Sequence, residues 1–211
     1  MQSKQQQFID LVTRVQNCSL CPRMNDRKRV LSSTNGSLDS VIVFIAEAPG
    51  RLGADMYGIP LYGDQTGRNF EFLLTNAGLK RDEIFITNAI LCNPRTSSGY
   101  NDSPNLSEIR NCSSFLRNTL EIIKPEYVAP LGTKALSALN VITKHQITLA
   151  SGVGKLFNWN GYQVYPLYHP GPRAMIWRDK AEQMRDYGIL ADVIFKNSIN
   201  GKSHYEVIKT E

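Results

Sequence analysis

Apolar runs recur along the chain at intervals that suit the strands of one sheet. Each run spans five to eight positions and is apolar at nearly every one of them. Continuous runs of this kind are typical of strands buried on both faces of a parallel sheet. The expected strands are residues 41–46, 84–91, 127–131 and 163–168.

Amphipathic segments lie between these runs. In residues 3–17, for example, Phe8, Leu11, Val12 and Val15 fall on one face of a helix. The expected helices are residues 3–17, 69–76, 106–123, 133–139 and 178–196. Strands that alternate with helices predict a parallel sheet covered on both faces, in which functional groups gather at the carboxyl ends of the strands.

The remaining segments are polar or rich in glycine. A glycine-rich segment runs from Gly53 to Gly67, and residues 95–104 are expected to form a loop. The sequence contains no internal repeat, so we expect a single domain over residues 1–196. Residues 197–211 are polar and predict a loosely held C-terminal tail.

Three polar side chains lie at or near the ends of the expected strands: Glu47, Asn88 and His169. Each has an ordinary structural role, in capping a turn, satisfying a buried loop or forming a hydrogen bond in the core. Their chemistry is nevertheless complementary. A carboxylate orients water or stabilises a cation, an amide reads a donor and an acceptor on a flat ligand, and an imidazole stabilises a developing anion. Together they predict a ligand site at this edge of the sheet.

The chain has four cysteines, which are Cys18, Cys21, Cys92 and Cys112. The first two form a Cys-x-x-Cys pair in a loop, which brings two sulfurs within reach of one metal centre. Four unrelated buried thiols are the alternative. The even number and the loop spacing favour one four-thiolate metal site. Zinc and a 4Fe–4S cluster both accept four thiolates, and the spacing alone does not choose between them.

Net charge and the absence of long apolar runs narrow the functional classes. The 211 residues carry a formal net charge of +5 and a sequence pI of about 9.0, which favours a polyanionic partner. No apolar run reaches the roughly 20 residues of a membrane helix, and the first residues lack the apolar core of a secretory signal. We therefore expect a cytoplasmic protein that does not bind membranes.

Several short motifs occur in a fixed order along the chain. They are Glu47-Ala48-Pro49-Gly50, Gly58-Ile59-Pro60-Leu61-Tyr62-Gly63, Thr87-Asn88 and His169-Pro170, with Cys92 and Cys112 between the last two. This order resembles the family 4 uracil-DNA glycosylases, which are iron–sulfur members of the uracil-DNA glycosylase superfamily. The resemblance covers the chain from about Cys18 to the final helix.

The resemblance implies a fold, a cofactor and a reaction. The implied fold is a three-layer α/β/α sandwich with a four-stranded parallel sheet. The implied cofactor is a 4Fe–4S cluster held by the four cysteines. The implied activity is that of a monofunctional DNA glycosylase in base excision repair, acting as a monomer on DNA that contains uracil or another deaminated base. Such an enzyme leaves an abasic site without cutting the strand.

The resemblance also implies roles for individual residues. His169 is expected to bond O2 of the departing base, while Glu47 and Asn101 help to place or activate water. Substrate contacts are expected from Ala48, Gly50, Leu61, Tyr62 and Asn88. The loop after His169 occupies the place of the wedge that fills the gap left by a flipped base, so Arg173 or Met175 is expected to contact DNA.

The chain departs from the family pattern at several places. Leu61 stands where the family has an aromatic residue that stacks on the base, and Tyr62 beside it is a candidate substitute. Asn93-Pro94-Arg95 follows Cys92 in place of the usual pair of prolines. These departures leave open a preference for deaminated purines, or a non-catalytic or weakly active protein that binds damaged DNA. A zinc-stabilised enzyme that binds nucleotides through the glycine-rich segment is a further alternative.

Overall fold

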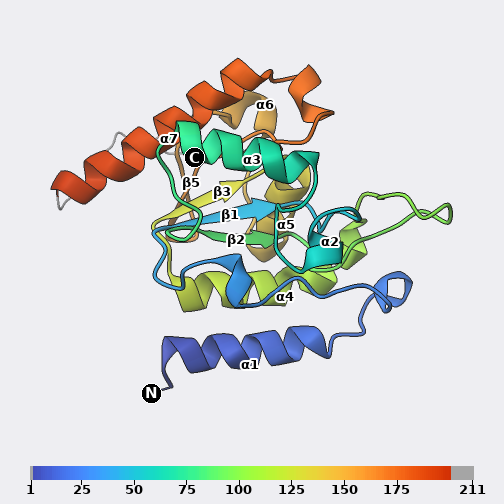
Figure 1. Cartoon of the computed structure of the whole chain (residues 1–211). Coiled ribbons are helices and arrows are strands. Elements are labelled where there is room, and N and C mark those ends of the chain that lie inside the picture. Colours follow the sequence, from blue (N-terminus) through green and yellow to red (C-terminus); the bar gives the residue numbers. More distant parts are fainter. Residues whose placement is uncertain (1, 201–211) are drawn as a thin grey trace.

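One sheet lies at the centre of the computed structural model, which describes residues 2–200 (Figure 1). Within these residues the sheet has five strands in the order β2-β1-β3-β5-β4. The strands are β1 Ile42–Ala46, β2 Phe85–Asn88, β3 Tyr127–Pro130, β4 Phe157–Trp159 and β5 Tyr162–Val164. Neighbours among β2, β1, β3 and β5 are parallel, as the alternating pattern predicts.

The predicted four-stranded, wholly parallel sheet is wrong by one strand. The short edge strand β4 pairs antiparallel with β5. The two are joined at Asn160 and Gly161, whose φ angles are +49° and +84°. A two-residue turn with both φ angles positive is the tight hairpin turn that Asn-Gly favours. The sheet is therefore mixed.

Seven α-helices surround the sheet within residues 2–200. They are α1 Lys4–Gln16, α2 Ala54–Tyr57, α3 Gln65–Asn76, α4 Leu106–Ile123, α5 Thr133–Ile142, α6 Leu149–Gly152 and α7 Lys180–Asn200. All five predicted helices are present, and α2 and α6 are additional single turns. Helix α3 begins four residues earlier than predicted, because Asp64 caps it by accepting a hydrogen bond from the Gly67 backbone N–H.

Side chains of β1 divide the core into two layers. Val43 and Ile45 pack into the cluster that includes residues of α1, α4 and α5. Phe44 points to the opposite face and packs edge-on against Phe70 of α3 and parallel to Tyr187 of α7. Helices thus cover both faces of the sheet (Figure 1).

Helix α7 extends into the segment that the sequence assigned to a polar tail. Its last residue is Asn200, so residues 197–200 are helical. The rest of the predicted tail, residues 201–211, lies outside the described residues. No helix within residues 2–200 combines the length and the apolar character that crossing a bilayer requires.

Candidate active site and cysteine cavity

The parallel register brings the three predicted polar side chains to the same edge of the sheet. Ala46 at the end of β1 pairs with Asn88 at the end of β2, so Glu47 follows directly beside it. The Ile90 backbone N–H donates to the Glu47 carbonyl over 3.3 Å, which keeps the two chain ends together. A bridge between Leu131 and Leu167 extends the β3 side of the sheet to within two residues of His169.

Asn88 is a buried amide with an unsatisfied donor. The residue is 2% exposed, and its Nδ2 atom has no hydrogen-bond partner in the described part of the chain. A buried donor without a partner costs about 1–3 kcal/mol. Such a cost at the end of a strand is typical of a group that meets its partner in a ligand.

His169 is held as a neutral hydrogen-bond donor. The Gly171 backbone N–H donates to its Nδ1 atom over 3.1 Å, so in the neutral ring the proton lies on Nε2. Burial lowers the pKa of His169 to about 4, although the charge of Asp64 acts in the opposite direction. The ring is therefore neutral at pH 7 and offers Nε2–H to an acceptor.

The lowered pKa of His169 predicts a stability that depends on pH. The unfolded chain, with a histidine pKa near 6.5, takes up this proton before the folded chain does. The unfolding free energy should therefore fall between pH 6.5 and about 4, by up to about 1.4 kcal/mol per pH unit. His169→Asn should remove this part of the slope, since an amide oxygen still accepts from Gly171 but does not titrate. Urea unfolding of both proteins across this pH range tests the prediction. An unfolding free energy with the same pH dependence in wild type and His169→Asn would contradict it.

Glu47 is oriented by the loop that precedes α4. The Ser103 hydroxyl donates to Glu47 Oε1 over 2.8 Å. Two residues earlier, Asn101 accepts from the Arg51 backbone N–H over 2.9 Å through its Oδ1 atom. The loop therefore contacts both the predicted carboxylate and the turn that follows it.

A polar network supports the same turn, and no pattern in the sequence predicted it. Asn93 donates from Nδ2 to the Pro49 carbonyl over 2.6 Å and to Asn101 Oδ1 over 3.0 Å. Arg95 donates to Asn93 Oδ1 over 2.7 Å and forms an ion pair with buried Asp55 over 2.5 Å. The segment after Cys92, Asn93-Pro94-Arg95, is therefore restrained by hydrogen bonds of Asn93 and Arg95.

Leu61 and Tyr62 lie differently with respect to the core. Leu61 is 8% exposed, packs into the same core cluster as Phe70 and has a φ of +47°, an unusual angle for a residue with a side chain. Tyr62 is exposed, and its ring meets Tyr57 edge-on at 5.7 Å. The exposed aromatic surface of the glycine-rich segment thus comes from Tyr57 and Tyr62.

Asp64 lies beside the Glu47–Gly50 turn, and the sequence analysis missed it. A β-carbon on Gly50 would lie 2.7 Å from Asp64 Oδ2, so a larger residue there would have to displace this carboxylate. Ala48, the other predicted contact in this turn, is half-buried. The available signal was Asp64 itself, because aspartate is a preferred N-cap residue and it directly precedes α3.

The loop after His169 is anchored at one point and exposed beyond it. Asn69 donates from Nδ2 to the Pro170 carbonyl over 2.8 Å and contacts the Met175 sulfur at 3.6 Å. Met175 is therefore partly buried, whereas Arg173 is exposed. Two large apolar side chains that the sequence analysis did not single out, Ile176 and Trp177, are each 80% exposed.

All four cysteines line one cavity. None of them forms a disulfide. The walls are completed by Met24, Asn25, Arg29, Ile90 and Asn111, and Asn111 donates to Cys21 Sγ over 3.4 Å. Burial raises the pKa of Cys92 to about 11 and that of Cys112 to about 12, while the charge of Arg29 acts against this rise at Cys92.

The donor set of this cavity suits a cluster of several metal atoms. Within residues 2–200, no group of three or more His, Cys, Asp or Glu side chains lies in an arrangement that could hold a metal ion. A 4Fe–4S cluster places each of four thiolates on a different iron atom, so its ligands surround a volume instead of a point. Four thiols around one shared cavity fit that requirement.

Comparison with known proteins gives one consistent family. Residues 34–188 match the family model described as the uracil DNA glycosylase superfamily. A type-4 uracil-DNA glycosylase of Thermotoga maritima is 30% identical, over 85% of this chain and 88% of the relative. One from Saccharolobus solfataricus is 32% identical, over 77% and 75% of the two chains. A type-5 uracil-DNA glycosylase of Pyrobaculum aerophilum is 29% identical, over 78% and 83%.

Proposed function

Because the chain belongs to the uracil DNA glycosylase superfamily, we propose that it is a monofunctional DNA glycosylase that hydrolyses the N-glycosidic bond of uracil in DNA. The product is an abasic site in an uncut strand, the first step of base excision repair. The observation that carries the proposal is the buried Asn88 amide, whose Nδ2 donor has no partner among residues 2–200. Uracil supplies the missing acceptor.

Asn88 gives the site its choice of base. Its Nδ2 donates to O4 of uracil, and its Oδ1 accepts from N3–H. Cytosine carries an amino group in place of O4, so its donor meets the donor of Asn88. A site built around such a hydrogen bond rejects an analogue that cannot complete it.

His169 and Glu47 act on the two charges that form as the bond breaks. The bonding electrons move to the base, and negative charge grows on O2, where the neutral Nε2–H of His169 donates. The sugar becomes cationic at C1′. Glu47, held by the Ser103 hydroxyl, stabilises this cation and orients the attacking water. Asn101 supports the turn after Glu47 through the Arg51 backbone.

The four-cysteine cavity is the proposed site of a 4Fe–4S cluster, held by Cys18, Cys21, Cys92 and Cys112. Arg29 beside Cys92 supports this assignment, because a cationic neighbour favours thiolates and an anionic cluster. The cluster supplies structural cross-linking of three chain segments. Cys92 lies four residues after Asn88, so the cluster fixes the far end of the segment that reads the base.

The loop after His169 is the proposed contact with the duplex. A uracil inside a stacked duplex must be flipped out before it reaches Asn88. Arg173 is exposed and supplies a cation for phosphates, while exposed Ile176 and Trp177 offer apolar surface to the gap in the base stack. Met175 anchors the loop to Asn69.

Substitution of Asn88 tests the proposed reading of the base. Wild type should release uracil and not cytosine. Asn88→Asp should lower uracil release by about 10²-fold, because a carboxylate repels O4, and should reduce the preference for uracil over cytosine. Single-turnover assays on otherwise identical oligonucleotides measure both rates. Asn76→Asp, at the exposed end of α3, is the matched control. An unchanged base preference in Asn88→Asp would contradict this assignment.

Leu61 favours a second candidate, a weakly active or non-catalytic protein that binds damaged DNA. An aliphatic side chain in the core gives up about 1–3 kcal/mol of stacking on the base. Tight binding of uracil-containing DNA without base release would support this candidate. Release of hypoxanthine or xanthine in place of uracil would indicate a preference for deaminated purines.

A further inference from the structure

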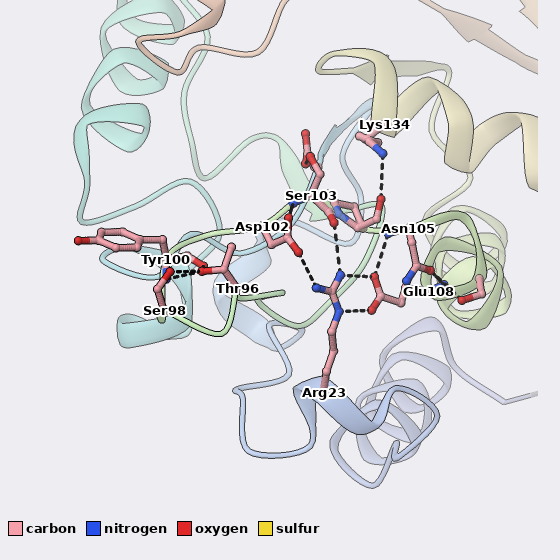
Figure 2. A network of polar contacts seen from close by, with 12 residues as sticks. Arg23, Thr96, Ser98, Tyr100, Asp102, Ser103, Asn105, Glu108 and Lys134 are labelled. Carbon is pink, nitrogen blue, oxygen red and sulfur yellow. Dashed lines mark hydrogen bonds and ion pairs between the residues drawn. The ribbon is translucent and has the colours of Figure 1, made fainter.

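Arg23 connects the cysteine cavity to the loop that orients Glu47. It lies two residues after Cys21, in the short 3₁₀ helix Pro22–Met24. In Figure 2 its guanidinium lies between Asp102 and Ser103 on one side and Glu108 on the other. It donates to both carboxylate oxygens of Glu108, over 2.5 Å and 2.8 Å, and to Asp102 over 2.7 Å.

Glu108 ties this contact to a second cavity residue. It lies in the first turn of α4 and completes a capping box, in which Asn105 and Glu108 satisfy each other's backbone N–H groups. Cys112 follows one helical turn later on the same helix. Arg23 and Glu108 are 85 residues apart in sequence. Their ion pair therefore joins the Cys21 segment to the Cys112 segment.

The same guanidinium fixes the residue that contacts Glu47. Arg23 donates over 3.3 Å to the Ser103 carbonyl. The Ser103 backbone N–H donates to Asp102 Oδ1 over 2.9 Å. The position of Ser103 is thus set from both sides by Arg23 and its ion-pair partner. The Ser103 hydroxyl then donates to Glu47 Oε1 over 2.8 Å.

The geometry of these contacts matters more than their stabilising energy. Asp102 and Arg23 are both partly exposed, and exposed ion pairs contribute little to stability. A bidentate pair, in contrast, fixes both the distance and the plane of the guanidinium. One arginine with three neighbouring partners defines where the 102–103 backbone lies.

We propose that Arg23 is a positioning residue for base release, which holds Ser103 against Glu47 whenever the Cys18–Cys21 loop is fixed. This inference rests on the proposed glycosylase activity. Arg23 then links the cysteine cavity, which lies outside the strand-end site, to the carboxylate that acts on the sugar. Loss of Arg23 should leave DNA bound but Glu47 misoriented.

Two variants and a matched control test the proposal. Arg23→Gln removes the ion pairs, and Ser103→Ala removes only the hydroxyl that contacts Glu47. Lys4→Gln is the control, because Lys4 also contacts α4, at the Ile123 carbonyl at the opposite end of that helix, and forms an ion pair with Asp39. Each protein is assayed for kcat, KM, iron content and amide hydrogen exchange.

The proposal predicts one pattern across these measurements. Arg23→Gln and Ser103→Ala should each lower kcat by roughly 10-fold with KM within about twofold of wild type, since misplacement of a catalytic group lowers the rate of the chemical step. The double variant should be no slower than either single variant, because both changes break one path. Amide exchange in residues 101–105 should accelerate in Arg23→Gln. Lys4→Gln should keep the wild-type kcat.

Other outcomes would overturn it. A raised KM with an unchanged kcat would make Arg23 a contact to DNA phosphate. A wild-type kcat in Ser103→Ala would show that the Ser103 hydroxyl does not orient Glu47 for the reaction, even if Arg23→Gln lost iron. A wild-type protein that releases no uracil would overturn the proposed function itself. The amide exchange of residues 101–105 would still decide, without any activity, whether Arg23 holds this loop.

Discussion

Replacing His169 by alanine should lower the single-turnover rate of uracil release by about 10²–10³-fold. The substitution removes the donor that meets negative charge on O2, and removal of one preorganised donor of this kind costs that much in other enzymes. Because Gly171 fixes the tautomer and burial keeps the ring neutral, this donor is in place before the substrate arrives. The rate is measured with excess enzyme on a duplex that carries one uracil.

A second histidine provides the control for His169→Ala. His145 also accepts from the backbone N–H two residues later, and its other ring nitrogen contacts the Leu136 carbonyl. It packs against Trp159 of the edge strand β4, among structural residues. His145→Ala should keep the wild-type rate once the folded fraction is matched. Equal rates for His169→Ala and wild type would contradict the role of His169 as the donor to O2 of the departing base.

Replacing Cys112 by serine should have the largest effect on stability. Cys112 is the buried cysteine of the four and lies within α4, which packs against α1 and α5. Loss of one ligand should release the proposed cluster, and its binding free energy then no longer supports the fold. We expect loss of iron and of visible absorption, with a fall in Tm of about 10 °C or more.

The exposed neighbour Ser114 gives the control for Cys112→Ser. Ser114→Ala changes the same helix without touching the cavity and should keep iron and Tm. Metal analysis of wild type, purified without oxygen, should find four irons per chain. Stoichiometric zinc without iron would contradict the proposed cluster. It would instead support the zinc site that the cysteine spacing left open.

Elements with local signals were predictable from the sequence. Helix α4 has the bounds that its amphipathic pattern predicts. Its start is also marked by the capping box of Asn105 and Glu108. The position of Glu47 after a strand followed from its apolar run, whereas Asn88 was expected inside a strand over residues 84–91 and is instead the last residue of β2. The β4–β5 hairpin was missed although Asn160-Gly161 is a strong turn signal, because its strands are only three residues long and carry no clear periodicity.

Contacts between distant segments had no such signal. The Arg23–Glu108 and Arg95–Asp55 pairs join residues 85 and 40 positions apart, and neither pair leaves a pattern in one sequence. The partial burial of Met175 depends on Asn69, 106 residues earlier. The sequence could name the strand-end residues, but only the fold identified the side chains that hold them in place.

Mass spectrometry of the products from one uracil-containing duplex tests the central claim most directly. The protein is purified without oxygen and incubated in excess with the DNA. We expect one free uracil per duplex, with an abasic site in an uncut strand, and no free base from the same duplex carrying cytosine. DNA that is bound but keeps its uracil would contradict the proposed glycosylase activity.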